Sequence, residues 1–230
     1  MFQWIKIFIF GSVALLLACC ATQSAHHRVP HYIDHIPERA IIIAQQTRYL
    51  TPQIVVLALH AYNKAQAAGY GEKHILTIID YAEASTHNRF WVIDLDRNKV
   101  LFRELVAHGM GSGMLYATRF SDQINSKTTS IGLFVTAATD YRGRHGRALR
   151  LRGLEPGFNG NAWTRAIVIH AGSYVSDRFI HAHGYVGCTW GCPALSAKDL
   201  NQIIATIKGG TLVFAYANDA NWLAHSKFLH

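Results

Sequence analysis

The feature that most limits how this chain can fold is a series of short apolar segments that begins near residue 75. Each is rich in Ile, Val, Phe, Tyr or Trp and is followed by polar or glycine-containing residues, which is the pattern of β-strands joined by turns. The four residues Asp96 to Lys99 suit a hairpin loop between two of these segments. We therefore expect a mostly β body with strands at Ile75 to Tyr81, Phe90 to Leu95, Val100 to Val106, Ile131 to Ala137, Ala166 to His170 and Thr211 to Tyr216.

A helix is predicted before the first strand. Apolar residues recur every three or four positions between Ile54 and Ala68, which is the spacing of an amphipathic helix. Thr51 suits the N-cap and Pro52 the first turn, while Gly69 or Gly71 ends the helix. This segment is expected to cover the body of the protein.

A second helix is predicted late in the chain. Ser196 and Asp199 have the spacing of a capping box, and Gly209 with Gly210 ends the helix. Because 50% of the residues are hydrophobic, the chain has enough apolar surface for a folded core, and long disorder is excluded. We expect one main core, with the buried stripe of this helix formed by Leu200, Ile203, Ile204 and Ile207.

The N-terminus has the pattern of a secretory signal. Lys6 precedes an uncharged apolar run from Ile7 to Ala18, which is shorter than the about 20 residues that a membrane span needs. The sequence Leu16 to Cys19 also resembles a bacterial lipoprotein signal, in which Cys19 becomes the lipidated first residue. A plain cut near Ala21, an uncleaved anchor and a buried N-terminal helix are the alternatives. We expect an exported protein of the periplasm or cell envelope, attached to a membrane only through this signal or a lipid on Cys19.

One cysteine and one histidine stand out as a candidate catalytic pair. Cys192 lies just before the second predicted helix, where the free N–H groups favour a thiolate, and Gly191 leaves room for a substrate carbonyl. His170 ends a predicted strand, so an imidazole at that point can serve as base to a thiol nucleophile. Since Pro193 has no N–H, the oxyanion donor is expected to be the amide of Cys192, Gly191 or a side chain.

These residues lie in a longer pattern. The stretches Arg165 to His170, Ser173 to Ser176 and Thr189 to Ala194 resemble the catalytic signature of the bacterial L,D-transpeptidases, in the branch with a Trp-Gly-Cys-Pro cysteine motif. The family usually has Gly where this chain has Ala171, followed here by Gly172, and Ser at the position of Thr189. The resemblance covers about residues 75 to 217, with further matching stretches at Leu76 to Tyr81, Trp91 to Leu95, Val106 to Gly109, Leu133 to Thr136, Leu149 to Leu151, Gly153 to Glu155 and Gly209 to Phe214.

The resemblance implies a mostly β, L,D-transpeptidase-type β-sandwich with a few helices and an N-terminal helical cover. It implies a Cys192 nucleophile, a His170 base oriented by the backbone carbonyl after it, and a catalytic set completed by Gly191, Ala171 and Gly172. The substrate would be a peptidoglycan tetrapeptide stem, cleaved after its third residue through a thioester without metal or organic cofactor. An amine acceptor gives transpeptidation, and water gives L,D-carboxypeptidase activity. The expected divisions are 1–20 signal peptide, 21–72 linker and helical segment, 73–218 catalytic domain and 219–230 C-terminal tail.

Candidate substrate-binding residues flank this pair. Five arginines lie between Tyr141 and Arg152, and arginine is well suited to hold the carboxylates of a stem peptide. The alternative is a solvated strand face. The chain has 22 Lys and Arg against 14 Asp and Glu, and its net charge of +8 fits attraction to an anionic cell wall. The residues expected at the substrate are Thr189, Trp190, His145, Arg147, Arg150 and His108.

Other functions compete with this interpretation. His181, His183, Cys188, Cys192 and His170 supply enough ligand types for a zinc site, although their spacing fits it loosely. A non-enzymatic wall-binding protein is a further alternative, whereas a secretion signal argues against nucleic acid as a partner. In an oxidising compartment Cys188 is either simply packed or forms a disulfide with Cys192 that protects the thiol.

Overall fold

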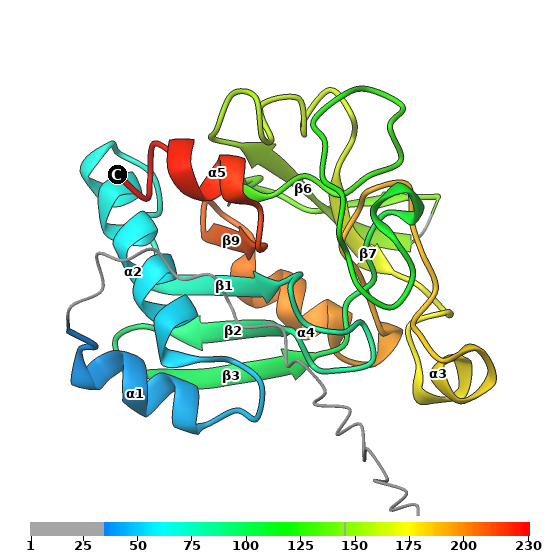
Figure 1. Ribbon diagram of the computed structural model, residues 1–230, viewed down its shortest axis with the longest axis horizontal. Helices are drawn as coiled ribbons and strands as arrows, with labels where there is room; N and C mark the ends of the chain where they lie inside the picture. Colours follow the sequence, from blue (N-terminus) through cyan, green and yellow to red (C-terminus); the bar gives the residue numbers. More distant parts are fainter. Residues whose placement is uncertain (1–34, 145) are drawn as a thin grey trace, which may run out of the picture.

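The strands of the computed structural model, which describes residues 35–144 and 146–230, form one connected sheet (Figure 1). The strand order is β3-β2-β1-β9-β4-β6-β7-β8, and β5 pairs with β6 beside this path. The strands are β1 (Ile75–Asp80), β2 (Phe90–Asp94), β3 (Lys99–Glu104), β4 (Gly132–Thr136), β5 (Tyr141–Gly143), β6 (Gly146–Gly153), β7 (Val168–Ala171), β8 (Ala194–Leu195) and β9 (Leu212–Tyr216).

Two strand pairings determine the topology. β9, the last strand in sequence, lies between β1, to which it is parallel, and β4, to which it is antiparallel. β6 pairs with β4 through residues 151–153 and with β7 through residues 148–150, so one strand belongs to both halves of the sheet. The expected mostly β, sandwich-type architecture with a few helices is confirmed.

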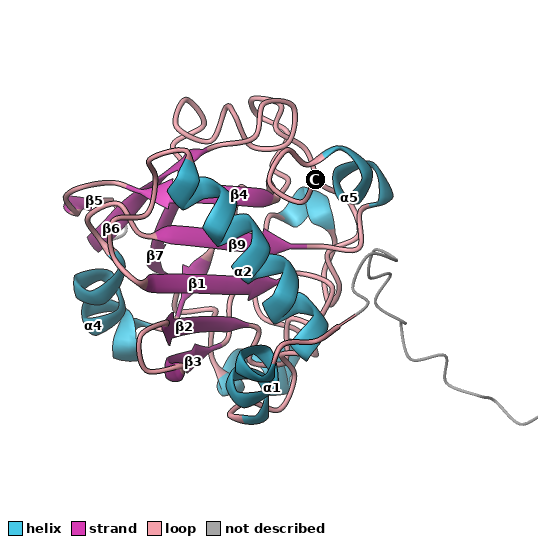
Figure 2. Cartoon of the chain, turned by 90° about the vertical axis from the view of Figure 1, so that its left-hand side faces the viewer, coloured by secondary structure: helices cyan, strands magenta, loops and turns pink. Residues whose placement is uncertain are grey.

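The helices cover the sheet on both faces. They are α1 (Glu38–Gln45), α2 (Pro52–Ala67), α3 (Asp177–His183), α4 (Ala197–Ile207) and α5 (Ala220–His225), with a 3₁₀ turn, η1, at Met110–Ser112. Figure 2 shows α2 crossing in front of β1 and β9, which it contacts, while α4 packs against β1, β6 and β7. None of the helices in residues 35–144 and 146–230 is both long enough and apolar enough to span a bilayer.

Local sequence explains where these helices begin. The Thr51 hydroxyl accepts a hydrogen bond from the Ile54 amide at 3.4 Å, and Pro52 occupies the first turn of α2 as expected. Ser196 caps α4 by accepting from the Lys198 amide at 3.3 Å. The Asp199 carboxyl group hydrogen-bonds Glu104 of β3, so it does not complete the expected capping box.

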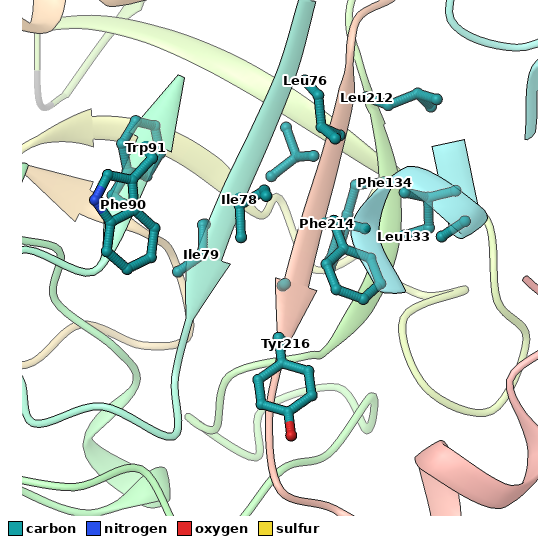
Figure 3. Packing of buried hydrophobic residues seen from close by; sticks show 14 of the residues in the cluster. Leu76, Ile78, Ile79, Phe90, Trp91, Leu133, Phe134, Leu212, Phe214 and Tyr216 are labelled. Atoms are coloured by element: carbon teal, nitrogen blue, oxygen red, sulfur yellow. The ribbon is translucent and has the colours of Figure 1, made fainter. Parts of the chain in front are cut away.

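The core lies on both faces of the central strands. Every residue of β2 and β9 is buried, because helices cover the faces that would otherwise meet water, and such strands read as continuous apolar runs. Figure 3 shows Ile78, Leu133 and Phe214 from neighbouring strands within this cluster. Each fully buried side chain of this size contributes about 1.5–3 kcal/mol.

Some elements differ from the sequence-based expectations. The segment 219–230, described above as a tail, forms α5, and its Trp222, Phe228 and Leu229 side chains lie in the core. α1 and α3 were not expected; α3 has no buried residue and therefore no apolar stripe to reveal it. The expected signal peptide at 1–20, with Cys19, lies outside the described residues.

Candidate active site

Cys192 lies in the short connection that leads into β8. β8 pairs in parallel with β7, and the register sets Ala194 opposite His170. Cys192 therefore stands two residues before the position paired with the histidine, on a neighbouring segment. Its Sγ is 3.7 Å from the carbonyl oxygen of Ala166 at the entry to β7, and the residue is half-buried. The parallel pairing thus joins the two segments that carry the expected nucleophile and base.

A hydroxyl group organises the turn before Cys192. The Thr189 Oγ1 accepts a hydrogen bond from the Gly191 amide at 3.0 Å and donates to the Cys192 carbonyl at 2.7 Å. Gly191 has φ +121, and a Cβ there would lie 2.6 Å from the Thr128 carbonyl oxygen, so only glycine fits. Because its N–H is bonded to Thr189, Gly191 is not the oxyanion donor considered above, and this expectation is corrected.

The His170 ring is fixed by the chain beside it. Its Nδ1 lies 2.8 Å from the Ala171 carbonyl oxygen, and the residue is only 3% exposed. A carbonyl oxygen can only accept, so Nδ1 carries the proton and Nε2 has the lone pair that a base needs. Gly172 donates its amide to the Leu195 carbonyl at 2.9 Å, and a Cβ there would lie 2.7 Å from the Tyr174 ring. The alanine at 171 thus still presents the orienting carbonyl.

The environment of Cys192 does not favour a thiolate. Burial raises the pKa of the thiol, while a hydrogen bond with the backbone of Val168 and the positive charge of Arg165 lower it less. β8 separates Cys192 from α4, which begins only at Ala197, and dipole stabilisation falls off within the first turn. The expected thiolate bias from the helix is therefore corrected: the thiol needs a base to lose its proton.

His108 does not border a cleft, contrary to the expectation from sequence. It is 0% exposed, and Arg89 Nη2 donates to its Nδ1 at 2.7 Å. Its Nε2 therefore carries the proton and donates to the Gly113 carbonyl at 3.0 Å. Burial, with a smaller contribution from Arg89, lowers the pKa of His108 to about 4. The side chain is a neutral support for the loop at Gly113 and cannot contact substrate.

The two arginines expected at the substrate have protein partners. Arg147 Nε lies 2.7 Å from the Asp140 carboxylate, and its Nη1 donates to the Asn201 carbonyl on α4 at 2.9 Å. Arg150 stacks 4.0 Å from the centroid of the Trp163 ring and hydrogen-bonds the Trp163 carbonyl. These contacts are those of structural side chains, and a role in holding substrate carboxylates stays a prediction.

The remaining predicted binding residues have different positions. Trp190 is 71% exposed next to Cys192, and the Lys127 Nζ lies 5.0 Å from the centroid of its ring. Thr189 is buried and faces its own turn. His145 lies outside the described residues. Of this set, Trp190 is the side chain that the structure leaves open to a ligand beside the cysteine.

The residues considered for a disulfide or a zinc site lie apart from one another in their contacts. Cys188 and Cys192 are both free thiols, and their Sγ atoms face different carbonyls, those of Gly113 and Ala166, each at 3.7 Å. His183 lies on α3, stacked on Phe179. Within residues 35–144 and 146–230, no group of three His, Cys, Asp or Glu side chains is arranged to hold a metal ion.

Sequence reasoning missed one charged residue at the site. The Arg165 side chain is only 3% exposed, and its Nη2 would lie 3.1 Å from a Cβ on Gly191. Ala166, which follows it, has φ +55 although it is not glycine. Arg165 lies directly before a predicted strand, and a buried arginine is unusual in proteins. Its hydrogen-bond partners are remote in sequence, so no local pattern reveals them.

The fold is mostly β, and the site has a cysteine and a histidine on neighbouring segments of the sheet. A family model described as the L,D-transpeptidase catalytic domain matches residues 46–216. The chain belongs to this family, which makes it a member of an acyltransferase family. A comparison with curated proteins gives no match.

Solved structures of L,D-transpeptidases are also similar to this chain. One from Mycobacterium smegmatis has 16% sequence identity and a TM-score of 0.38, over 63% of this chain and 59% of that one. One from Xylanimonas cellulosilytica has 16% identity and a TM-score of 0.39, over 77% of each chain. One from Stackebrandtia nassauensis has 13% identity and a TM-score of 0.38, over 78% of this chain and 77% of that one. The chain thus spans less than two thirds of the M. smegmatis protein.

Proposed function

We propose that this protein is a peptidoglycan L,D-transpeptidase that acts at the third residue of tetrapeptide stems through a thioester on Cys192. The observation that carries the proposal is the pairing of β7 with β8, which joins the Cys192 turn to the strand of His170 in a chain of this family. The orientation of the ring supports it, because Nδ1 faces the Ala171 carbonyl, which makes Nε2 the nitrogen for the exchange of protons with a thiol. We also propose that the protein belongs to the branch of the family with a Trp-Gly-Cys-Pro cysteine motif.

The first half-reaction transfers the stem to the enzyme. His170 Nε2 takes the thiol proton as the Cys192 sulfur attacks the carbonyl carbon of the third stem residue. The carbon–nitrogen bond to the terminal D-alanine breaks, His170 returns the proton to the leaving amine, and a thioester remains. Since burial raises the pKa of the Cys192 thiol, His170 has to remove the thiol proton before or during attack.

The second half-reaction releases the stem. An amine of a second stem attacks the thioester carbonyl and transfers its proton to His170. The carbon–sulfur bond breaks, and His170 gives that proton to the departing sulfur, which restores the thiol. Water in place of the amine gives the carboxypeptidase product. Neither route uses a metal or an organic cofactor.

We propose that the backbone N–H of Cys192 donates a hydrogen bond to the oxyanion that forms on the substrate carbonyl. Gly191 is already bonded to Thr189, and Pro193 has no N–H. Among residues 35–144 and 146–230, no acceptor receives a hydrogen bond from the Cys192 amide. A donor of this kind, fixed before substrate arrives, stabilises the charge that develops on the carbonyl oxygen.

Location and domain limits are also proposals. We infer that the protein is exported and works in the periplasm or cell envelope, with the signal at 1–20 and lipid on Cys19 as its attachment. The catalytic domain is proposed at 73–218, although the family match begins earlier, at residue 46. The match therefore includes α2, which we describe as the helical cover.

The test is incubation of the purified protein with a disaccharide-tetrapeptide, followed by mass spectrometry of the products and of the intact protein. We expect loss of the terminal D-alanine, an adduct on Cys192, and either a cross-linked dimer or a tripeptide. Cys192→Ala should abolish product formation, and Cys188→Ala, a matched loss of a thiol four residues away, should retain it. Product formation by Cys192→Ala at the wild-type rate would exclude the thioester mechanism.

A further inference from the structure

A single buried arginine fastens the segment 121–130 beside the candidate active site. Arg165 Nη1 donates to the Ser121 carbonyl at 2.7 Å and to the Ser130 Oγ at 2.6 Å. Its Nη2 donates to the Thr128 carbonyl at 2.7 Å and to the Ser126 Oγ at 3.2 Å. Four hydrogen bonds from one planar group fix both ends and the middle of this segment, which has no strand or helix of its own.

The segment held in this way lies directly against the cysteine turn. A Cβ on Gly191 would lie 2.6 Å from the Thr128 carbonyl oxygen and 3.1 Å from the Arg165 Nη2. The arginine and its loop therefore fill the space beside the residue that precedes Cys192. On the other side, the Thr129 Oγ1 accepts a hydrogen bond from the Gly109 amide at 2.9 Å.

Backbone strain is concentrated in the same place. Asn125, Lys127 and Ala166 have φ of +62, +56 and +55, a conformation that non-glycine residues adopt at a cost. Such strain costs about 1–3 kcal/mol per residue and persists only where surrounding contacts enforce it. Ala166 follows Arg165, and its carbonyl oxygen faces the Cys192 Sγ. The contacts of Arg165 thus hold the segment that contains Asn125 and Lys127, and the residue after Arg165 contacts the sulfur.

We propose that Arg165 is the positioning residue of this site: its guanidinium group holds segment 121–130 against Gly191 and places a fixed positive charge beside the Cys192 sulfur. The proposal rests on the function proposed above, since it assigns to Arg165 the support of that nucleophile. The positive charge stabilises the sulfur when it is anionic, and the anchored segment keeps Lys127 over the exposed Trp190 ring at the mouth of the site.

The charges around the sulfur agree with this role. Burial raises the pKa of Cys192, and Arg165 lowers it. Tyr81 and Tyr174 also lie near Cys192: burial raises the pKa of both, and the negative charge of an ionised Cys192 raises it further. Asp122 lies 4.0 Å from Arg165 Nη1 and opposes its charge. His170 is the proposed base and receives the thiol proton.

The experiment measures the ionisation of Cys192 without any peptidoglycan substrate. Alkylation of the full chain by iodoacetamide is followed from about pH 7 to pH 12, with fragment ions in mass spectrometry separating Cys192 from Cys188, because only the thiolate reacts. We expect the midpoint for Cys192 to rise by about one pH unit in Arg165→Gln. Trypsin should also cleave faster after Lys127 in this variant.

Arg39→Gln is the matched control. It removes the same charge and also breaks hydrogen bonds to a loop, since Arg39 binds Asn98 and Leu95, but it lies on α1, away from β7 in both views (Figures 1 and 2). A Cys192 midpoint that is equal in folded Arg165→Gln and Arg39→Gln overturns the charge part of the proposal. Equal rates of cleavage after Lys127 overturn the anchoring part.

Asp122→Asn tests the charge with a milder change. The asparagine side chain keeps an oxygen for the hydrogen bond from the Asn161 backbone N–H, which Asp122 accepts at 2.8 Å. The substitution removes the negative charge that opposes Arg165. We expect the Cys192 midpoint to fall. An unchanged or higher midpoint contradicts the proposal even if Arg165→Gln does not fold. Since no stem peptide is needed, this result is independent of whether the protein transfers stems.

Discussion

At the scale of single residues, the Thr189 hydroxyl makes two hydrogen bonds within the turn before Cys192. It bonds the Gly191 amide and the Cys192 carbonyl at once, so it sets the direction in which the Cys192 amide and sulfur point. We expect Thr189→Val, which keeps the shape and removes the hydroxyl, to lower kcat/KM at least about tenfold, because an unsatisfied buried group costs about 1–3 kcal/mol.

Thr189→Ser is the control for this prediction, since serine keeps the oxygen and loses only a methyl group. Its kcat/KM on a tetrapeptide stem should stay within about threefold of the wild-type value, while thermal unfolding shows whether each variant is folded. Equal rates for the valine and serine variants would mean that the turn does not depend on this hydroxyl.

Much of the site could be predicted from sequence because its motif is local. Cys192, Gly191 and Thr189 are neighbours along the chain, and the short turn places them together in any fold that contains it. Arg165 could not be found in this way, since its partners at Ser121 and Thr128 are remote in sequence and are reached only through the folded chain. His108 was misassigned because sequence does not show that Arg89 buries it.

At the scale of elements, β3 and α4 meet through two acidic side chains. Burial and the neighbouring Asp199 raise the pKa of Glu104 from its ordinary 4.5 to about 7, and Lys198 partly opposes this. Between these pH values the folded chain keeps a proton that the unfolded chain has lost. The contribution of Glu104 to stability is therefore full below about pH 4.5 and is lost as the pH rises through about 7.

Glu104→Gln should remove this dependence. We expect a higher Tm than wild type at pH 8, where the ionised pair repels, and a smaller difference at pH 5, with Tm read by circular dichroism. The exposed Glu72→Gln on the connection before β1 provides the control and should show neither effect. A Tm difference between Glu104→Gln and wild type that is the same at pH 5 and pH 8 would show that the proton is held by another group.

The elements that sequence predicted well are those with a strong apolar pattern. The buried stripe of α4 and the runs of β2 and β9 are buried as expected, and so is β1 except for the half-buried Ile75. β8 has only two residues and exists because it pairs with β7, and β5 is fully exposed. Such elements are set by their partners, so no property of the short segment itself predicts them.

At the scale of the whole molecule, α5 ties the end of the chain to the middle of the fold. The Trp222 Nε1 donates to the Glu155 Oε2 at 3.1 Å, and the Glu155 Oε1 accepts from the Leu133 amide of β4 at 2.6 Å. Glu155 is 2% exposed, and burial raises its pKa. A carboxyl group buried this deeply is stable only while its hydrogen bonds are satisfied.

Trp222→Phe removes one of these bonds and keeps an aromatic ring. We expect a loss of about 1–3 kcal/mol in the free energy of unfolding, measured by urea denaturation, with Tm lower by several degrees. Trp163→Phe, at a ring that is 40% exposed, is the matched control and should lose less. Equal losses in the two variants would show that the contact with Glu155 contributes little.

The central place of β9 has a consequence for how the chain acquires its structure. Within residues 35–144 and 146–230, β9 is synthesised after all the strands it joins, and it separates β1 from β4 in the finished sheet. Until residue 216 is available, β1 and β4 have no strand between them, and pairings over such long sequence separations form slowly. The order of the strands therefore makes the pairing that joins β1 to β4 a late, long-range step in folding.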